Sequence, residues 1–355
     1  KVDVLMLVHP IAMGADAAYA IDQFVLRGGR VLAFLDPVSE IGAMTNPMLA
    51  GGGVKANPDL DKLLTAWGVK FDGKHVAGDI ANARRVQAGG PNGEISYYVA
   101  WHEVTDRSLS KGEVLADGVK LLHLATPGHF EHVKDAKTKF EPILSTSNKA
   151  MLIDGSKFLG QPDPAALERD YVPGGKPLVI AARVTGAIST AFPDGRPKSE
   201  EDKKKEAEAA KQKANGKDSK AANKDAKAEQ QQLKSGKVNA ILVADSDMLY
   251  DQFWVTVRDL FGQEVAMPNA HNAVFLMNAL ENLSGGEALS GLRGRGIDDR
   301  PFVMVEDIRR ESESKYRKSE QALLAKLKGL QARLEKVGQK TGADGTVSLA
   351  LSDED

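Results

Sequence analysis

The chain has 355 residues, and its 47 basic and 49 acidic residues leave a formal net charge of −2 at pH 7. A net charge this small argues against an overall electrostatic design for nucleic acid or an anionic membrane surface. The chain contains no cysteine, which excludes disulfides, thiolate zinc sites and a cysteine nucleophile. With 42% hydrophobic residues, it forms one large domain with additions or two domains.

The first 35 residues predict a strand, a helix and a second strand. Residues 2–8 and 31–35 are apolar runs, and residues 17–26 have the spacing of an amphipathic helix that ends before Gly28. Two strands joined by such a helix run parallel, with a right-handed crossover. We therefore predict a doubly wound, mostly parallel sheet, with Asp36 at the carboxyl end of the second strand.

The next part of the chain adds a helix, further strands and loops. Asn57 is expected to cap a helix that starts at Pro58. Segment 127–175 contains several Pro and Gly residues, so we expect loops and short strands over the sheet there. Apolar runs predict further strands at 95–101, 119–124 and 178–184.

The stretch from 238 to 284 has the clearest local pattern. An apolar run at 238–244 predicts a buried strand, which ends abruptly in an acidic turn at 245–247. Apolar residues at helical spacing predict one helix over 248–260 and a second over 272–283. Polar groups thus collect at the carboxyl end of a strand, where α/β folds usually bind ligands.

A charged insertion interrupts the α/β domain, which we assign to 1–197 and 236–300. Residues 198–235 contain 11 lysines and 8 acidic residues, but no aromatic residue, Val or Ile. Such a segment buries too little apolar surface to offset the entropy cost of ordering its backbone. We expect a disordered, solvated insertion, which the near balance of charge favours over a basic functional arm.

Residues 301–338 are expected to form a helical stalk, followed by a tail at 339–355. Within the predicted helix, 305–337, apolar residues recur at spacings of 7, 4, 3, 4 and 3, which is a coiled-coil heptad pattern. They are Tyr316, Leu323, Leu327, Leu330, Leu334 and Val337. This apolar seam needs a partner, which is expected to be a helix beyond the acidic end of the chain or a second copy.

The two ends of the chain suggest a fragment. A predicted strand starts directly after Lys1, which leaves no room for a signal peptide. No apolar run approaches the roughly 18 residues that span a bilayer. We therefore expect any membrane anchor to lie outside these boundaries.

Five separated segments carry a family resemblance. They are YAIDQFVLRGGRVLAFLDP, NPDLDKLLTAWGVKF, ILVADSDMLYDQFWV, NAVFLMNALENLSG and LRGRGIDDRPFVMVEDIRRESESKYRKSEQ. In this order they resemble the GldG-like auxiliary component of ABC-type transport systems associated with gliding motility. The resemblance covers nearly the whole chain apart from the insertion. It implies a periplasmic or extracytoplasmic domain, anchored by membrane helices absent from this chain, that works with an ABC permease and its ATPase.

The fold of such regions is similar to the class I glutamine amidotransferase-like α/β fold. Amidotransferases of that fold pair a cysteine nucleophile with a histidine. This chain has no cysteine, and no Gly-x-Ser-x-Gly elbow, phosphate-binding P-loop, HExxH or dinucleotide-binding motif replaces it. The chain therefore cannot be the ATPase of its transporter, and we expect no catalytic residue, no cofactor and no metal.

The candidate ligand pocket consists of three aspartates and two arginines. Asp36, Asp245 and Asp247 follow predicted strands, so they would form a metal site or an acid–base pair, or would cap turns and helices. Arg293 and Arg295 lie in a Gly-rich loop that suits a phosphate or carboxylate, or that pairs with nearby acids. Capping and acid pairing are the simpler interpretations.

Two further groups of residues have a functional and a structural interpretation. His123, His129 and His132 would suit a metal if their segment were helical, but a surface cluster without function is favoured because of the intervening Pro and Gly. The three tryptophans would line a sugar-binding groove or pack in the core, and their apolar surroundings favour the core. They are Trp67, Trp101 and Trp254.

Two functional hypotheses follow. The first is a non-catalytic extracytoplasmic binding or coupling domain of an ABC-type transport system, with oligomerisation through the stalk left open. The second is a cysteine-independent hydrolase on the same fold that uses Asp and His residues. Convergence of Asp36, Asp245 and a histidine in one pocket with perturbed protonation favours the hydrolase. Capping of separate elements favours the binding domain.

Overall fold

The computed structural model describes residues 2–40, 57–87, 95–160, 162–197, 232–260, 263–285, 319 and 322–331. The chain divides into two units, Lys1–Gly294 and Arg295–Asp355. All described strands belong to the first unit.

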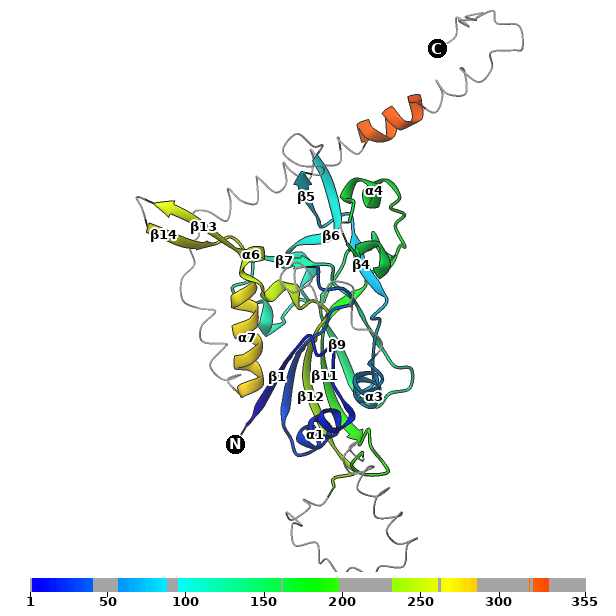
Figure 1. Ribbon diagram of the computed structural model, residues 1–355, viewed down its shortest axis with the longest axis vertical. Helices are drawn as coiled ribbons and strands as arrows, with labels where there is room; N and C mark the ends of the chain where they lie inside the picture. The colour runs from blue at the N-terminus through cyan, green and yellow to red at the C-terminus, as the bar shows by residue number, and fades with distance from the viewer. Residues whose placement is uncertain are drawn as a thin grey trace, which may run out of the picture. The chain divides into compact units, whose positions relative to one another are not determined.

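Two parallel strand pairs start the main sheet (Figure 1). β1 (Val4–Val8) lies beside β2 (Arg30–Phe34), and β2 lies beside β12 (Ser235–Val243). α1 (Ala15–Leu26) connects β1 to β2, which confirms the predicted strand–helix–strand unit. β2 and the second half of β12 are buried, as expected for continuous apolar runs in parallel strands.

The other strands of this sheet run antiparallel. β11 (Val179–Ser189) pairs with every residue of β12 from Ala181 onwards. β9 (Lys139–Ser145) and β8 (Phe130–His132) pair with β11, and β3 (Val69–Phe71) pairs with β8. The strand order is β1-β2-β12-β11-β8-β3. The predicted doubly wound, mostly parallel sheet of the amidotransferase-like kind is therefore wrong, because the fold is mixed α/β with mostly antiparallel strands.

The connection between β11 and β12 explains this difference. Parallel neighbours require a crossover whose apolar side packs on the sheet. Between residues 198 and 235, Leu233 is the only large apolar side chain. This composition does not favour such a crossover, and β11 and β12 pair antiparallel.

Two smaller sheets surround a second core. β4 (His75–Asp79) pairs with β10 (Ala150–Asp154), while β5 (Ala83–Gln87), β6 (Ile95–Thr105) and β7 (Leu121–Ala125) form an antiparallel sheet. Both strands predicted in the β6–β7 region are thus confirmed. The core beside them includes the buried side chains of Val76, Tyr98, Val99, Ile153 and Phe158.

Short helical elements complete this part of the chain. α4 (Pro164–Arg169) begins after Asp163, whose carboxylate accepts hydrogen bonds from two helix amides. The segment 127–175, predicted to hold loops and short strands over the sheet, contributes β8 and β9 to the main sheet itself. The single-turn 3₁₀ helices are η1 (Asp106–Ser108), η2 (Val114–Ala116) and η3 (Gly155–Phe158).

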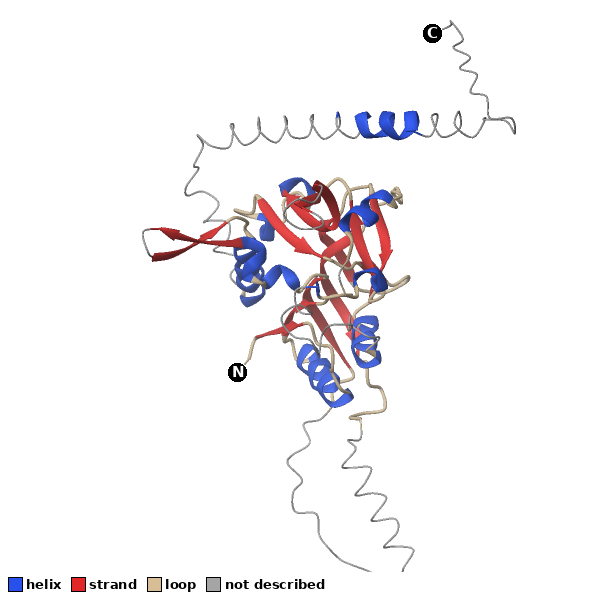
Figure 2. Ribbon diagram, turned by 45° about the horizontal axis from the view of Figure 1, so that its top comes forward, coloured by secondary structure: helices blue, strands red, loops and turns tan. Residues whose placement is uncertain are grey.

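A β-hairpin replaces the helix predicted over 248–260. After β12 come two short turns, η4 (Asp247–Leu249) and α6 (Asp251–Trp254). β13 (Val255–Leu260) and β14 (Gln263–Pro268) then form a hairpin that projects from the rest of the unit (Figure 2). The helix prediction is wrong because β13 opens with Val, Thr and Val, three β-branched residues that favour extended backbone.

Three longer helices pack on the strands. α3 (Pro58–Ala66) is capped by Asn57, whose side chain accepts from the amides of Asp59 and Leu60, as predicted. α1 packs on β12 and contacts α3. α7 (Asn272–Ser284) confirms the predicted second helix and contacts β1, β2, β12 and β7. It ends at Gly285, whose φ of 94° is the left-handed conformation that glycine adopts without strain.

The second unit is described only in part. Its described residues, 319 and 322–331, are helical, and Leu323, Leu327 and Leu330 are exposed there. The long C-terminal helix predicted over 305–337 is not shown.

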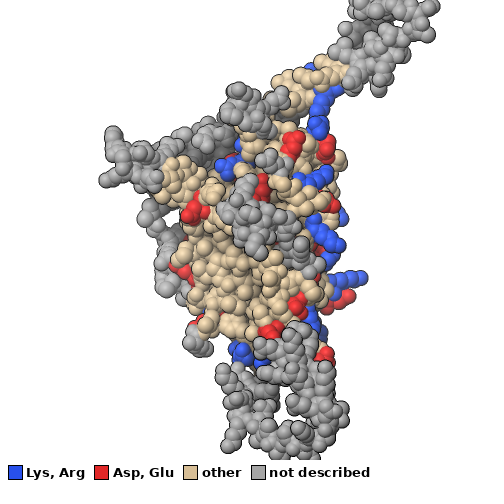
Figure 3. Space-filling model, viewed as in Figure 1, with Lys and Arg blue, Asp and Glu red and all other residues tan. Residues whose placement is uncertain are grey.

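The face of the molecule in Figure 3 carries charged side chains of both signs. Lys and Arg side chains are interspersed with Asp and Glu on the face in Figure 3, which also carries a broad area with few charged side chains. This distribution agrees with the small net charge of the sequence. Within the described residues, none of the helices has both the length and the apolar character needed to span a membrane.

Candidate functional site

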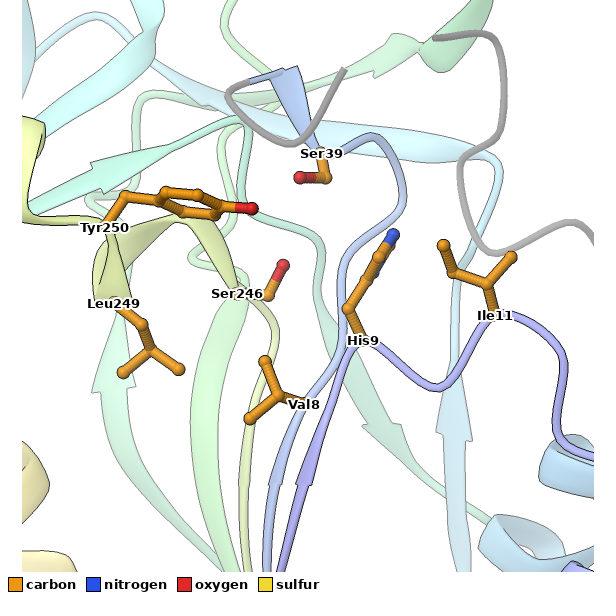
Figure 4. A pocket seen from close by; sticks show the side chains of 7 residues that line it. All are labelled: Val8, His9, Ile11, Ser39, Ser246, Leu249 and Tyr250. Carbon is orange, nitrogen blue, oxygen red and sulfur yellow. The ribbon is translucent and has the colours of Figure 1, made fainter. Parts of the chain in front are cut away.

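A pocket of about 480 Å³ lies at the carboxyl ends of the parallel strands (Figure 4). Residues directly beyond β1, β2 and β12 meet there, which is the edge where open α/β sheets place ligands. The volume is within the usual range for small-molecule sites. The pocket is lined by Val8, His9, Ile11, Ser39, Ser246, Leu249 and Tyr250.

His9 follows β1 in an unusual conformation. Its φ of 44° is in the left-handed region, which non-glycine residues seldom adopt. The backbone is held there because the His9 amide donates to the Phe34 carbonyl at 2.8 Å and the His9 carbonyl accepts from the Ile11 amide at 2.8 Å. Both ring nitrogens are shielded from solvent and have no hydrogen-bond partner among the described residues. Burial lowers the pKa of His9, so the imidazole is neutral near pH 7.

Two serine hydroxyls of the pocket donate their protons to aspartates behind them. Ser39 Oγ donates to Asp247 Oδ1 at 2.5 Å, and Ser246 Oγ donates to Asp36 Oδ2 at 3.0 Å. A hydroxyl has one proton, and each of these serines uses it in the bond to its aspartate. Both serines are almost fully buried, with 4% and 3% of their surface exposed.

Asp36, Asp245 and Asp247 lie close enough for their charges to interact, and all three are fully buried. Asp36 accepts from the amides of Val38 and Ser246 at 3.1 and 3.0 Å. Asp245 accepts from the amides of Ala125 and Met248 at 2.8 and 2.9 Å. The bonds to Val38 and Met248 are local turn bonds, whereas the Ser246 and Ala125 amides come from other parts of the chain. The Asp245–Ala125 bond connects β7 to the end of β12.

Burial raises the pKa of Asp36 and of Asp245 well above the usual range. The second cause for both is repulsion from the nearby Asp247 carboxylate. Protons are therefore retained in this cluster at a pH where exposed aspartates are ionised. A role for the three aspartates in ligand binding remains a prediction, and Arg293 and Arg295 lie outside the described residues.

Glu40 adds a fourth buried carboxyl group that the sequence did not single out. It accepts from Tyr98 Oη at 2.9 Å and from Trp101 Nε1 at 3.0 Å. Burial raises its pKa, and Asp247 contributes further repulsion. Trp101 is thus held by a polar contact as well as by packing against Phe253, at 5.0 Å between ring centroids. Trp67 is a core residue with 2% exposure, as predicted.

The predicted histidine cluster does not form a site in the described residues. His123 is buried, and its Nδ1 contacts the Phe253 carbonyl at 2.6 Å. His129 is also buried, whereas His132 is exposed and stacks on Phe140. The surface-cluster interpretation is therefore wrong for two of the three. Within the described residues, no group of three or more His, Asp or Glu is placed to hold a metal ion.

The described residues define a mixed α/β domain with a pocket at the ends of its parallel strands. The chain belongs to the family described as "ABC-type uncharacterized transport system", whose model matches residues 1–279. The protein is therefore an auxiliary component of an ABC-type transport system. No curated protein and no solved structure matches the chain significantly.

Replacing Asp247 with asparagine is expected to make stability depend less on pH. Asp36 and Asp245 hold protons to a higher pH in the folded chain than at their unfolded pKa of about 4. Stability therefore falls as pH rises from about 4 towards the raised folded values. Removing the Asp247 charge lowers both folded pKa values, so the loss of unfolding free energy between pH 5 and pH 8 should shrink by about 1 kcal/mol.

Urea unfolding at the two pH values measures this change. Asp251→Asn removes the same charge from an exposed residue and should reproduce the wild-type pH dependence. An unchanged pH slope in Asp247→Asn would show that Asp247 does not hold the protons on its neighbours.

Proposed function

We propose that this chain is a non-catalytic, extracytoplasmic binding and coupling domain that works with the permease and ATPase of an ABC-type transport system. Its family supports the transport role. The narrower resemblance to GldG-like components supports a periplasmic position and an anchor formed by segments outside this chain. The pocket supplies a place for a ligand on the folded domain.

The hydrogen bonds that the backbone amides around Ser246 donate support a non-catalytic role. The amides of Ser246 and Met248 donate to Asp36 and Asp245, and the Asp247 amide also bonds to Asp245. Acyl-transfer enzymes instead aim such amides at the developing oxyanion beside the nucleophile. Here the amides next to the candidate hydroxyl are already used to stabilise buried carboxyl groups.

One observation favours the alternative of a hydrolase. Asp36 and Asp245 do meet with raised pKa values, Ser246 Oγ lies 3.0 Å from Asp36, and His9 lines the same pocket. A panel of ester, amide, glycoside and phosphate substrates tests this alternative directly. Turnover that is lost in both Asp36→Asn and Asp245→Asn would replace the binding proposal with a catalytic one.

Co-purification tests the transport assignment. The full-length protein, tagged and extracted from membranes of its own host with mild detergent, should bring the permease and the ATPase with it. A membrane-anchored extracytoplasmic protein of unrelated function, carrying the same tag, is the control. Failure to recover either transporter subunit, even after chemical cross-linking in intact cells, would contradict the proposal.

A further inference from the structure

We propose that His9 is the recognition residue of the strand-end pocket, and that it selects a small uncharged ligand whose polar group both donates and accepts hydrogen bonds. A primary amide or an alcohol on an apolar body has this chemistry. The inference rests on the binding role proposed above and adds the chemical class of the ligand. It depends on three observations: the backbone conformation of His9, the hydrogen-bonding state of its ring and the composition of the pocket wall.

The backbone of His9 is held in an unfavourable conformation. Its φ of 44° lies in the left-handed region, which costs free energy in a residue that has a side chain. The His9 amide is bonded to Phe34 and the His9 carbonyl to Ile11, so the surrounding structure keeps this conformation in place. Strained residues of this kind cluster at binding and catalytic sites. Because His9 also lines the pocket, we assign the strain to ligand recognition.

The imidazole of His9 has hydrogen-bonding capacity that the described residues do not use. Burial lowers its pKa and keeps the ring neutral near pH 7, so one nitrogen is a donor and the other an acceptor. Neither nitrogen has a hydrogen-bond partner among the described residues, and a buried polar atom without one is costly. Figure 4 shows the imidazole beyond the end of β1 with a ring nitrogen at its outer end. Rotation about the Cβ–Cγ bond turns either nitrogen towards a ligand in the pocket.

The wall of the pocket favours an uncharged ligand with a hydrocarbon part. The residues that line the pocket include no Lys, Arg, Asp or Glu, so an ionic ligand group would leave water without gaining an ionised partner on the wall. Asp36 and Asp245 lie behind the wall and retain protons because burial raises their pKa values, which weakens any attraction for a cation. Val8, Ile11 and Leu249 supply aliphatic surface, and a volume of about 480 Å³ suits a small molecule.

Benzamide, benzoate and benzamidine separate the hydrogen-bonding pattern of a ligand from its shape. The three probes share a ring and a planar head group, but benzamide is neutral and both donates and accepts, benzoate only accepts, and protonated benzamidine only donates. In calorimetric titrations near neutral pH, benzamide should bind saturably, in the millimolar range expected for so small a probe. Each ion should bind at least about tenfold more weakly. Absence of benzamide binding, or equal or tighter binding of either ion, would overturn the inference.

A histidine variant tests the role of His9 itself. His9→Phe keeps an aromatic ring and removes both ring nitrogens, so it should weaken benzamide binding about five- to tenfold. It should also reduce the preference for benzamide over the two ions, whereas a loss of stability would affect the binding of all three probes alike. His132→Phe makes the same substitution at an exposed ring that stacks on Phe140, and should leave affinity and preference unchanged. Wild-type affinity and preference in His9→Phe would contradict the assignment.

A spectroscopic readout on the unmodified protein does not depend on the folding of a variant. In protein with ¹⁵N-labelled histidine, the ring signals of His9 should shift on saturation with benzamide, whereas those of the exposed His132 should not. Benzamide binding that leaves the His9 signals unmoved would place the probe at another site and refute the inference. Recovery of the permease and ATPase without benzamide binding would sink this inference alone, while benzamide binding without either subunit would sink only the transport assignment.

Discussion

Replacing Asn272 with alanine should lower the free energy of unfolding by about 3 kcal/mol. Asn272 is 1% exposed and makes three side-chain hydrogen bonds. Its Oδ1 accepts from the His123 amide, and its Nδ2 donates to the carbonyls of His123 and Met248 at 2.8 Å each. Alanine would leave one donor and two acceptors buried without partners at the junction of α7, β7 and η4.

Denaturant unfolding followed by circular dichroism measures this loss. Asn269→Ala is the matched control, because Asn269 is exposed and, within the described residues, its side chain makes one hydrogen bond, from Nδ2 to Thr256 Oγ1. The control should cost less than about 0.5 kcal/mol. Equal losses in the two variants would show that the buried Asn272 network does not hold the pocket side of the domain together.

A methyl group at Gly236 is expected to cost about 2–3 kcal/mol of stability. A Cβ built there would lie 2.6 Å from the Leu26 carbonyl oxygen and 2.8 Å from the Leu26 Cα. These are backbone atoms at the end of α1, so no side-chain rotation relieves the overlap. Gly236→Ala would therefore push the first residues of β12 away from the helix that covers them.

Thermal and urea unfolding of Gly236→Ala give the measurement. Gly14→Ala is the control, because a Cβ at Gly14 meets nothing within 4 Å and its backbone is extended. Because Gly14 is the N-cap of α1, where alanine is less favourable than glycine, this variant should lose at most about 1 kcal/mol of stability, less than Gly236→Ala. A wild-type midpoint for Gly236→Ala would mean that α1 does not pack as closely on β12 as the structure shows.

Elements with local signals could be predicted from the sequence. β1, α1 and β2 follow from apolar runs and helical spacing, and their parallel pairing follows from the length of the crossover. The start of α3 follows from Asn57 and Pro58, which need no tertiary contact to act as cap and first residue. Gly285 is a similar local signal, which marks the end of α7.

Elements decided by long-range pairing could not be predicted. An apolar run such as β11 is equally compatible with parallel and antiparallel neighbours, so its pairing with β12 is visible only in the structure. Helical spacing over 248–260 competes with the extended preference of Val255, Thr256 and Val257, and pairing with β14 decides the outcome. The periodicity of residues 248–260 contains no information about their pairing with β14.

Residues of the candidate site also differ in whether a local sequence signal could predict them. Asp36, Asp245 and Asp247 could be predicted to meet because parallel strand ends share one edge of a sheet. His9 follows a predicted strand in the same way, and that position was the signal for it. Glu40 gave no signal, because its partners Tyr98 and Trp101 come from a distant strand of another sheet.

Because β11 and β12 pair antiparallel, we expect the domain to tolerate added sequence between these two strands. Beyond the last strand pair, the Thr190 amide donates to the Lys234 carbonyl at 2.9 Å. This bond holds the residues after β11 next to the residues before β12. Ser246 in the pocket lies past the other end of β12, about 30 Å away for a nine-residue strand. Doubling the length of a closed loop costs only about 0.6 kcal/mol. We therefore expect a fluorescent reporter or affinity tag inserted into this segment to leave the pocket at the strand ends unchanged.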